Sequence, residues 1–328
     1  MRRNICLILL GLSAACSNAG ESLKYPSLAI GRLAVSDYFD RDASGGVTPD
    51  DTTFAGARFA LLAPGGTDTL RTAVANASGV AIFDSVPVGA YRLVVDRHAL
   101  GDSIGVVQGD TGLVRLVTTQ DSITAIRTIG LGYSVVSLAT ARTLPVGRRV
   151  FVRGVVTVPL QTFSDTATYL NDSSSALRVT NAHPIGRTTR NGIGDSVMVL
   201  GTIAQVHGLT VLDQGAIYTL AIGPAPVPIT VTVTDARTAQ GGTLDAQLVK
   251  VIGTTIRDTA TVNGVFVVRA SDPADSTNLV DVLIDPALGA PASFFPIGST
   301  MTITGALSYD GANVWGIKPR MAGDIIIP

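Results

Sequence analysis

Glutamate and lysine are nearly absent from this chain of 328 residues. It contains one glutamate, Glu21, and three lysines, so aspartate and arginine supply almost all of its charge. Glutamate and lysine are good helix formers, whereas aspartate favours caps and turns, so this shortage predicts little helix. Aromatic residues make up only 5% of the chain, which leaves few rings for a stacking surface. Beyond the N-terminal segment, no apolar run is long enough to span a bilayer.

Residues that usually carry catalysis are also sparse. The three histidines, His98, His183 and His207, lack the H-x-x-x-H spacing of a metal site. The chain has no Walker loop and no G-x-S-x-G nucleophile elbow. A net charge of −1 argues against a protein that coats nucleic acid by bulk electrostatics. These absences predict a protein that is not an enzyme, and a hydrolase whose Ser, His and Asp meet only in space is the alternative.

The N-terminus has the pattern of an export signal. Two arginines at 2–3 precede the apolar stretch 5–12, and the small residues 13–15 lead into Cys16. A cysteine in this place resembles the lipobox of bacterial lipoproteins, and an ordinary cleavable signal is the alternative. The resemblance implies a signal peptide at 1–15, a tether at 16–27, and a membrane contact only through lipid on Cys16. Ser17 directly follows this cysteine, and a serine there resembles the pattern of lipoproteins that diderm bacteria sort to the outer membrane.

The segment 28–133 has the composition of a β-sheet module. Valine, isoleucine and threonine alternate with other residues between glycine and proline turns, which predicts strands at 28–35, 57–62, 69–75, 80–83 and 91–95, with two more between 105 and 133. Residues 72–83 and 86–95 resemble the prealbumin-like B domains of serine-aspartate-repeat adhesins and the carboxypeptidase regulatory-like domains. The resemblance implies a β-sandwich, with Phe83 and Tyr91 in its core and Gly79 in a tight hairpin.

From residue 134 onward one strand template repeats, at 147–156, 194–203 and 298–307. Each copy has a turn glycine, an alternating strand and a second glycine seven positions later. A glycine inside a strand is typical of a bulge or sharp bend, as needed at the corner of a small barrel. We therefore predict two tandem five-stranded barrels, at 134–224 and 229–328, joined by the proline-rich linker 225–228.

Particular motifs support this architecture. The run L-P-V-G-x-x-V-x-V-x-G-V-V, the sequence Tyr169-Leu-Asn-Asp172 and the strand G-D-x-V-x-V-x-G resemble the OB-fold modules attached to secreted bacterial nucleases and other surface proteins. Because these motifs are structural ones and no nuclease domain follows, the resemblance implies the architecture and not the activity. The predicted class is all-β: a prealbumin-like sandwich followed by two OB-like barrels.

One segment has the spacing of a calcium loop. Such a loop needs oxygen ligands at positions 1, 3, 5, 7, 9 and 12, with glycine at position 6. Counting from residue 40, these positions hold Asp40, Asp42, Ser44, Gly46 (through its carbonyl), Thr48 and Asp51, and Gly45 is at position 6. Aspartate replaces the usual glutamate at position 12, and no flanking helices are predicted. Ca²⁺ is the predicted cofactor, and a solvated acidic turn is the alternative.

A second candidate surface is basic. The first barrel has seven arginines against four aspartates, whereas the second has six basic residues against nine aspartates. Only the first barrel could therefore present a basic groove to an extracellular nucleic acid or glycan. The candidate residues are Arg148, Arg149 and Arg153, with Phe151 and Tyr169 as stacking rings. The alternative is that these arginines are scattered and the rings fill the core.

Together these features predict a non-catalytic lipoprotein of the bacterial cell envelope. Its expected role is binding, adhesion or scaffolding, with calcium stabilising the first module and an envelope protein or extracellular polymer as partner. It would lie on the outer membrane or the cell surface, with a periplasm-facing position also open. The other readings are an accessory module that binds a polymer through the first barrel, and an unrecognised hydrolase.

Overall fold

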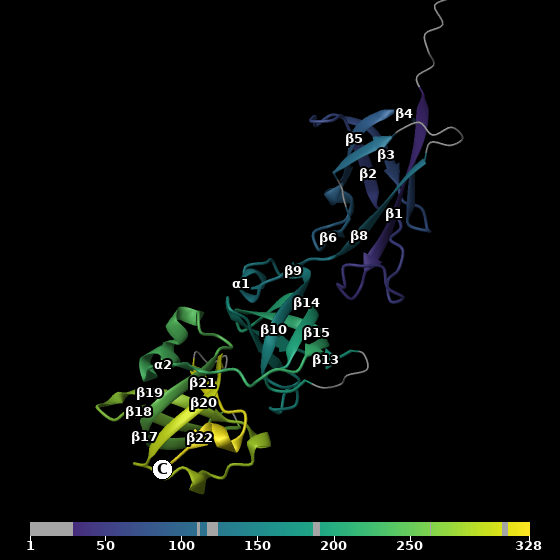
Figure 1. Cartoon of the computed structure of the whole chain (residues 1–328). Helices are drawn as coiled ribbons and strands as arrows, with labels where there is room; N and C mark the ends of the chain where they lie inside the picture. Colours follow the sequence, from purple (N-terminus) through teal and green to yellow (C-terminus); the bar gives the residue numbers. More distant parts are fainter. Residues whose placement is uncertain (1–28, 110–111, 117–123, 186–190, 263, 310–313) are drawn as a thin grey trace, which may run out of the picture.

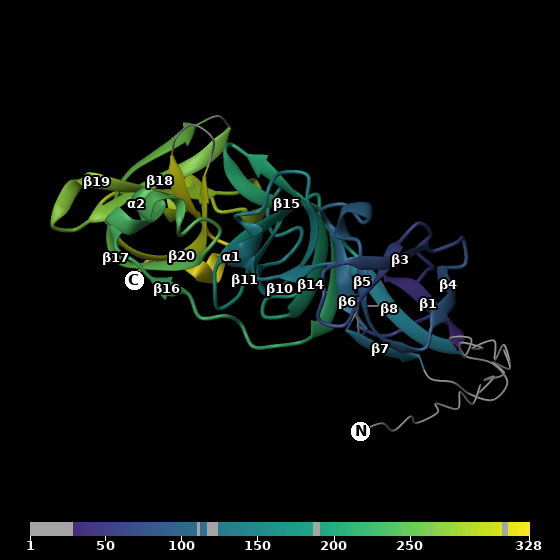
Figure 2. The ribbon, with the colours of Figure 1, turned by 90° about the horizontal axis from the view of Figure 1, so that it is seen from above.

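The computed structural model describes residues 29–109, 112–116, 124–185, 191–262, 264–309 and 314–328. The strands form three units that follow one another in space as they do along the chain (Figures 1 and 2). The predicted all-β class is confirmed, since the described α-helices are the short α1 (Leu138–Ala141) and α2 (Val233–Gly242). None of the helices in these ranges is long and apolar enough to cross a membrane.

The first unit is a sandwich of two four-stranded sheets. One sheet has the order β4-β1-β8-β6, and its strands are β4 (Val80–Pro87), β1 (Ile30–Asp40), β8 (Thr124–Tyr133) and β6 (Ile104–Gln108). The other has the order β3-β2-β5-β7, and its strands are β3 (Thr69–Val74), β2 (Arg58–Leu62), β5 (Gly89–Val95) and β7 (Leu113–Leu116). The 3-10 helix η1 (Arg97–Ala99) follows β5.

The predicted core positions of the sandwich are buried. Phe83 is 3% exposed and Tyr91 is 8% exposed, and both pack in one cluster with Leu33, Phe59 and Leu93. Gly79 has a φ of +70°, which a glycine adopts without strain. These positions alternate along their strands, so the inward faces of both sheets share a single apolar core.

Two strand predictions in this unit were wrong. The first strand was expected to end at residue 35, but β1 continues to Asp40 because β8 pairs with it in parallel from Arg32 to Asp40. Between 105 and 133 the structure has three strands and not two, since β7 forms an edge beside β5. The extension of β1 matters for function because it places Asp40 at the end of a central strand.

The second unit is a closed barrel. Its ring runs β10-β11-β12-β15-β14 and returns to β10, because β10 pairs with both β11 and β14. The strands are β10 (Arg149–Val158), β11 (Thr168–Asn171), β12 (Ala176–Thr180), β14 (Ser196–Val206) and β15 (Leu209–Ala221), with the short β9 (Val135–Val136) and β13 (His183–Pro184) beside them.

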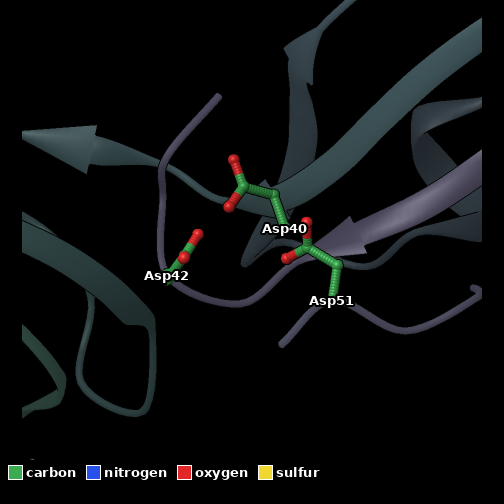
Figure 3. A group of neighbouring side chains, drawn as sticks. All are labelled: Asp40, Asp42 and Asp51. Carbon is green, nitrogen blue, oxygen red and sulfur yellow. The ribbon is translucent and has the colours of Figure 1, made fainter. Parts of the chain in front are cut away.

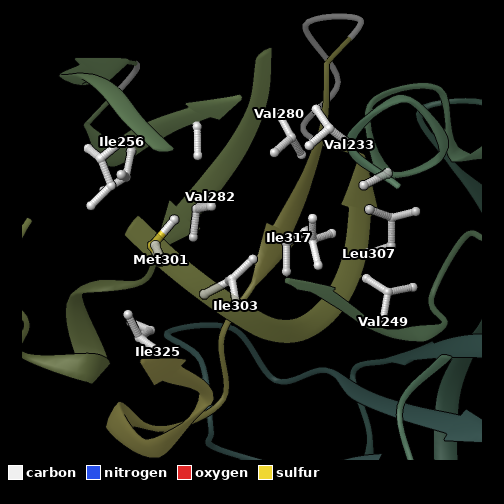
Figure 4. Packing of buried hydrophobic residues seen from close by; sticks show 14 of the residues in the cluster. Val233, Val249, Ile256, Val280, Val282, Met301, Ile303, Leu307, Ile317 and Ile325 are labelled. Carbon is white, nitrogen blue, oxygen red and sulfur yellow. The ribbon is translucent and has the colours of Figure 1, made fainter. Parts of the chain in front are cut away.

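The third unit repeats this topology. Its ring runs β17-β18-β19-β21-β20 and closes through a pairing of β17 with β20. The strands are β17 (Leu248–Val262), β18 (Val265–Asp272), β19 (Asp275–Ile284), β20 (Thr300–Tyr309) and β21 (Trp315–Lys318), with the short β16 (Ile229–Thr230) and β22 (Ile325–Ile326). Three 3-10 helices complete it: η2 (Pro286–Leu288), η3 (Ala292–Phe294) and η4 (Ala322–Asp324). Aliphatic side chains from the whole ring, among them Val249, Val282 and Ile303, meet in its core (Figure 4).

The repeated mid-strand glycines allow the barrels to close. A Cβ on Gly201 would lie 2.5 Å from Cγ of Leu212, and the pairing of β14 with β15 shifts register beside it. A Cβ on Gly305 would lie 2.6 Å from the carbonyl carbon of Lys318. At both positions a neighbouring strand approaches too closely for any side chain. The predicted irregularity is present beside Gly201, whereas the pairings of Gly305 with β17 and of its neighbour Ala306 with β21 show no register shift there.

The two barrels are packed directly against each other, with hydrogen bonds and apolar contacts between them. Arg142 of barrel 1 donates hydrogen bonds to Oδ2 of Asp245 at 3.2 Å and to the carbonyl oxygen of Gly242 at 3.0 Å. A buried apolar cluster crosses the same boundary and comprises Val158, Phe163, Ala167, Tyr169, Ala176, Ala246 and Ala306. A shared apolar cluster and a half-buried ion pair fix one barrel on the other.

Replacing Gly201 by alanine should destabilise barrel 1. The added methyl group would overlap Leu212, so we expect the free energy of unfolding to fall by about 1–3 kcal/mol. Urea denaturation followed by circular dichroism measures this change. The control is Gly66→Ala, because a Cβ at Gly66 would have its nearest neighbour at an ordinary 3.5 Å. Equal stabilities of the two variants would contradict the close-approach argument.

Asp37 should make the stability of the sandwich depend on pH. Its side chain is 2% exposed, and burial raises its pKa to about 6, an effect that the hydrogen bond from the Phe54 amide only partly offsets. The stability contributed by the protonated carboxyl is complete below pH 4 and is lost as the pH rises through 6. Relative to Asp37→Asn, the wild type should lose about 2–3 kcal/mol between pH 4 and pH 7. Denaturation series for both proteins measure this difference, and parallel pH profiles would disprove it.

Candidate functional site

The candidate calcium loop is held at both ends by β1. Asp40 is the last residue of that strand, and the chain returns to it at Thr52, which pairs with Phe39 as an isolated antiparallel bridge. Two residues later the amide of Phe54 donates a hydrogen bond to Oδ1 of Asp37 at 3.2 Å. The loop is therefore closed by backbone pairing to a central strand, and this pairing brings residue 51 back beside residue 40.

Three of the predicted ligands converge in this loop. Carboxylate oxygens of Asp40, Asp42 and Asp51 lie within 4.8 Å of one another, and Figure 3 shows the three groups gathered at the end of β1. Asp40 is 1% exposed, whereas Asp42 and Asp51 are half-buried. Converging carboxylates of this kind are the hard oxygen donors that calcium prefers.

The other predicted ligands lie in the same loop and are linked by hydrogen bonds. Oγ of Ser44 donates to the carbonyl oxygen of Gly46 at 3.1 Å, and Oγ1 of Thr48 donates to Oδ2 of Asp42 at 3.5 Å. Asp51 accepts the amide of Thr48 at 2.7 Å through Oδ2. The short side chain of Asp51 at position 12 therefore accepts hydrogen bonds from the loop backbone. Its two oxygens are less free than those of a glutamate to bind a cation together.

Electrostatics in the loop favours a cation. Burial raises the pKa of Asp40, and the neighbouring Asp51 carboxylate raises it further. Burial also acts on Asp42, but hydrogen bonds from Ser44 outweigh it and hold the pKa of Asp42 below its ordinary value. A calcium ion would supply the positive charge that these crowded carboxylates need in order to be ionised together. Of the six predicted ligands, the carboxylates of Asp40, Asp42 and Asp51 are the ones that converge, and carboxylate oxygens are donors of the kind that calcium takes.

The loop also contacts barrel 1, which the sequence analysis missed. Ala43 packs against a cluster on the outer face of the barrel that consists of Phe151, Met198, Leu200 and Ala216. Tyr218 lies beside it: burial raises its pKa, the charge of Arg41 lowers it, and the charge of Asp42 raises it.

The predicted polymer-binding surface of barrel 1 was wrong in its aromatic part. Phe151 is fully buried, and Tyr169 is 1% exposed, so neither ring can stack on a base or a sugar. Phe151 points outward from the barrel but is covered by the sandwich and its loop, and Tyr169 is covered by barrel 2. Both rings serve as contacts between units, because a large apolar ring on the outer face of a small barrel must be covered.

Two of the three predicted arginines, Arg149 and Arg153, are exposed and alternate with inward-facing residues of β10, on the same face as Phe151. Arg149 is exposed and lies over the Tyr133 ring at 5.2 Å, which places it at the junction with the sandwich. Arg153 is exposed two positions beyond Phe151 on β10, whereas Arg148 is half-buried. Because Phe151 and Tyr169 are buried between units, these arginines have no exposed ring beside them. They do not form the expected basic groove with stacking platforms.

The histidines are in three different elements. His98 is in η1, His183 is in β13, and His207 is at the turn between β14 and β15. Nδ1 of His98 lies 3.6 Å from Oδ1 of Asp96, and the ring centroids of His207 and Tyr309 are 6.5 Å apart. Cys16, the predicted lipidation site, is outside the described residues.

Comparisons with known proteins give no family. No protein-family model matches the chain. No curated protein matches it either.

Solved structures show only weak similarity. The major pilin SpaD from Corynebacterium diphtheriae is 13% identical over 84% of this chain and 55% of its own, with a TM-score of 0.25. A murine DNA-binding protein bound to double-stranded DNA is 9% identical over 54% of this chain and 96% of its own, with a TM-score of 0.29. The hypothetical protein ygiW from E. coli is 21% identical over 26% of this chain and 89% of its own, with a TM-score of 0.21. TM-scores this low support no conclusion about fold or function.

Proposed function

We propose that this chain is a non-catalytic binding protein displayed at the bacterial cell envelope, in which calcium in the loop 40–51 fixes the sandwich on barrel 1. The observation that carries the proposal is the position of the loop. Its three converging carboxylates are next to Ala43, which packs against the outer face of barrel 1. An ion bound there would therefore order a loop that serves both units.

The physical argument concerns the stiffness of this junction. A row of rings, Phe54, Phe39, Tyr133, Phe151 and Tyr218, crosses it with centroid separations of 5.3 to 6.3 Å. Phe39 is directly before Asp40, so the acidic loop and the aromatic row share one strand end. A cation bound in the loop would reduce the repulsion between its carboxylates, next to Phe39 of the aromatic row. A stiff junction suits a protein that must hold its distal barrels away from a membrane.

Export and lipid attachment complete the proposal. The positive and apolar segments before Cys16 support secretion, and Cys16 supports an acyl anchor followed by the tether 16–27. Display on a lipid anchor would leave the three packed units free to engage an envelope protein or an extracellular polymer.

Calcium should bind the loop and stabilise the protein. Because Asp51 is short for position 12, we expect a dissociation constant on the order of 10⁻⁴–10⁻³ M, which calorimetric titration measures. At a hundredfold excess over that constant, the free energy of unfolding should rise by about 2.7 kcal/mol. Hydrogen exchange should slow both in residues 41–53 and around Tyr218, because the loop contacts both units.

A matched pair of variants makes this test specific. Asp42→Asn removes one carboxylate of the cluster and should weaken calcium binding by about tenfold or more. Asp50→Asn removes the same charge from an exposed neighbour outside the cluster and should leave calcium binding intact. Equal loss in both variants would reduce the effect to bulk charge, and no binding at millimolar calcium would refute the calcium site.

Lipid attachment has its own test. In a diderm bacterial host, the protein should incorporate a labelled fatty acid and remain with membranes after lysis. Cys16→Ser should lose both the label and the membrane association, because a thiol is the acylated group. A protein that is released in soluble form with Cys16 intact would show that the segment is an ordinary cleaved signal.

A further inference from the structure

A cavity of about 560 Å³ lies between the two barrels. Barrel 1 contributes Arg178 of β12 and His207 of the β14–β15 turn, and barrel 2 contributes the outer face of β18 and β19 together with Tyr309 at the end of β20. Its volume is in the range of pockets that hold small ligands, about 300–1,000 Å³. The cavity is separate from the acidic loop, which belongs to the sandwich and contacts barrel 1 through Ala43.

The wall formed by β18 and β19 has an apolar half and a polar half. Val267 is opposite Leu283 in the pairing of the two strands, and Arg269 is opposite Asp281 two residues further on. Nε of Arg269 lies 3.6 Å from Oδ1 of Asp281. A ligand on this wall would meet an aliphatic surface beside a donor and an acceptor that are held side by side.

The cations of the cavity are already compensated. Nη2 of Arg178 lies 3.0 Å from Oδ2 of Asp165, and Nη1 of Arg269 lies 3.0 Å from Oδ2 of Asp258. Nζ of Lys318 lies 3.4 Å from Oδ2 of Asp285. A phosphate would have to displace a carboxylate from a partly buried ion pair, so this lining disfavours nucleic acid.

The remaining features match a polyhydroxylated ligand. A hydroxyl group both donates and accepts, so it can bond a carboxylate and a guanidinium that are already paired with each other. The centroid of the Tyr309 ring is 6.5 Å from that of His207 and 5.0 Å from that of Trp315, and Tyr309 lines the cavity with an amphipathic ring.

We propose that the cavity between the barrels binds a short neutral glycan, with Arg269 and Asp281 bonding its hydroxyl groups and Tyr309 packing on a sugar ring. This ligand class rests on the binding role proposed above but not on the calcium loop. Failure of the glycan test therefore leaves the calcium result standing, and failure of the calcium test leaves this one standing.

The test is a calorimetric titration of the full chain with three neutral tetrasaccharides: β-1,4-linked glucose, α-1,4-linked glucose and β-1,4-linked N-acetylglucosamine. A short oligothymidylate is the anionic comparison, and EDTA in every sample removes the calcium loop from the result. We expect saturable binding of at least one tetrasaccharide, with a dissociation constant on the order of 10⁻⁵–10⁻³ M. The oligothymidylate should not compete with it.

Variants place the ligand in the cavity. Arg269→Gln and Tyr309→Ala should each weaken glycan binding by about tenfold or more, because each removes a polar or stacking partner. Arg237→Gln is the matched control, since Arg237 is an exposed arginine of the same barrel that bonds Asn278 outside the cavity. Melting curves identify any variant that has lost its fold, and Arg269→Gln keeps the test valid if Tyr309→Ala is unstable.

Three outcomes would overturn the proposal. One is the absence of saturable binding for all three tetrasaccharides at about 10 mM. Another is glycan binding that both cavity variants retain, which would place the ligand elsewhere on the chain. The third is salt-sensitive binding of the oligothymidylate that Arg269→Gln abolishes, which would make the cavity an anion site.

Discussion

The arrangement of the three units depends on covering the outer faces of barrel 1. A strand in a closed barrel has one face inside and one face outside, and the inside of this barrel is filled by aliphatic side chains. Phe151 and Tyr169 are left outside that core, and each becomes buried only where a neighbouring unit covers it. Burial of such side chains is worth about 1.5–3 kcal/mol each, so barrel 1 is stabilised by both neighbours.

Polar groups at these interfaces add geometric precision. The pair between Arg142 and Asp245 is taken partly out of water, where burial raises the pKa of Asp245 and the charge of Arg142 opposes that rise. A buried ion pair contributes little net stability unless its remaining donors are satisfied. Arg142 also donates to the carbonyl oxygens of Gly242 and Ala176, so its guanidinium bonds both barrels at once. Both proposed sites are in or beside such junctions, and neither is on a free-standing module.

Much of the fold could be predicted because it depends on local pattern. The mid-strand glycines at 201 and 305 mark close approaches of neighbouring strands, and Phe83 and Tyr91 are in the core, as the family resemblance implied. The length of β1 could not be predicted in this way. Residues 36–40 are extended because β8, almost a hundred residues later, pairs with them. Pairing over that separation leaves no signal in the segment itself.

The amino-acid sequence was enough to predict the all-β fold class, the repeated strands and the spacing of oxygen ligands from Asp40 to Asp51. These properties follow from side-chain chemistry and short-range periodicity, which do not depend on what packs nearby. The contacts that Phe151 and Tyr169 make between units, and the cavity that Arg178 and Arg269 line from different barrels, depend on packing between the units. Alternation shows that a strand has two faces, but which neighbour covers each face is set by packing between distant parts of the chain.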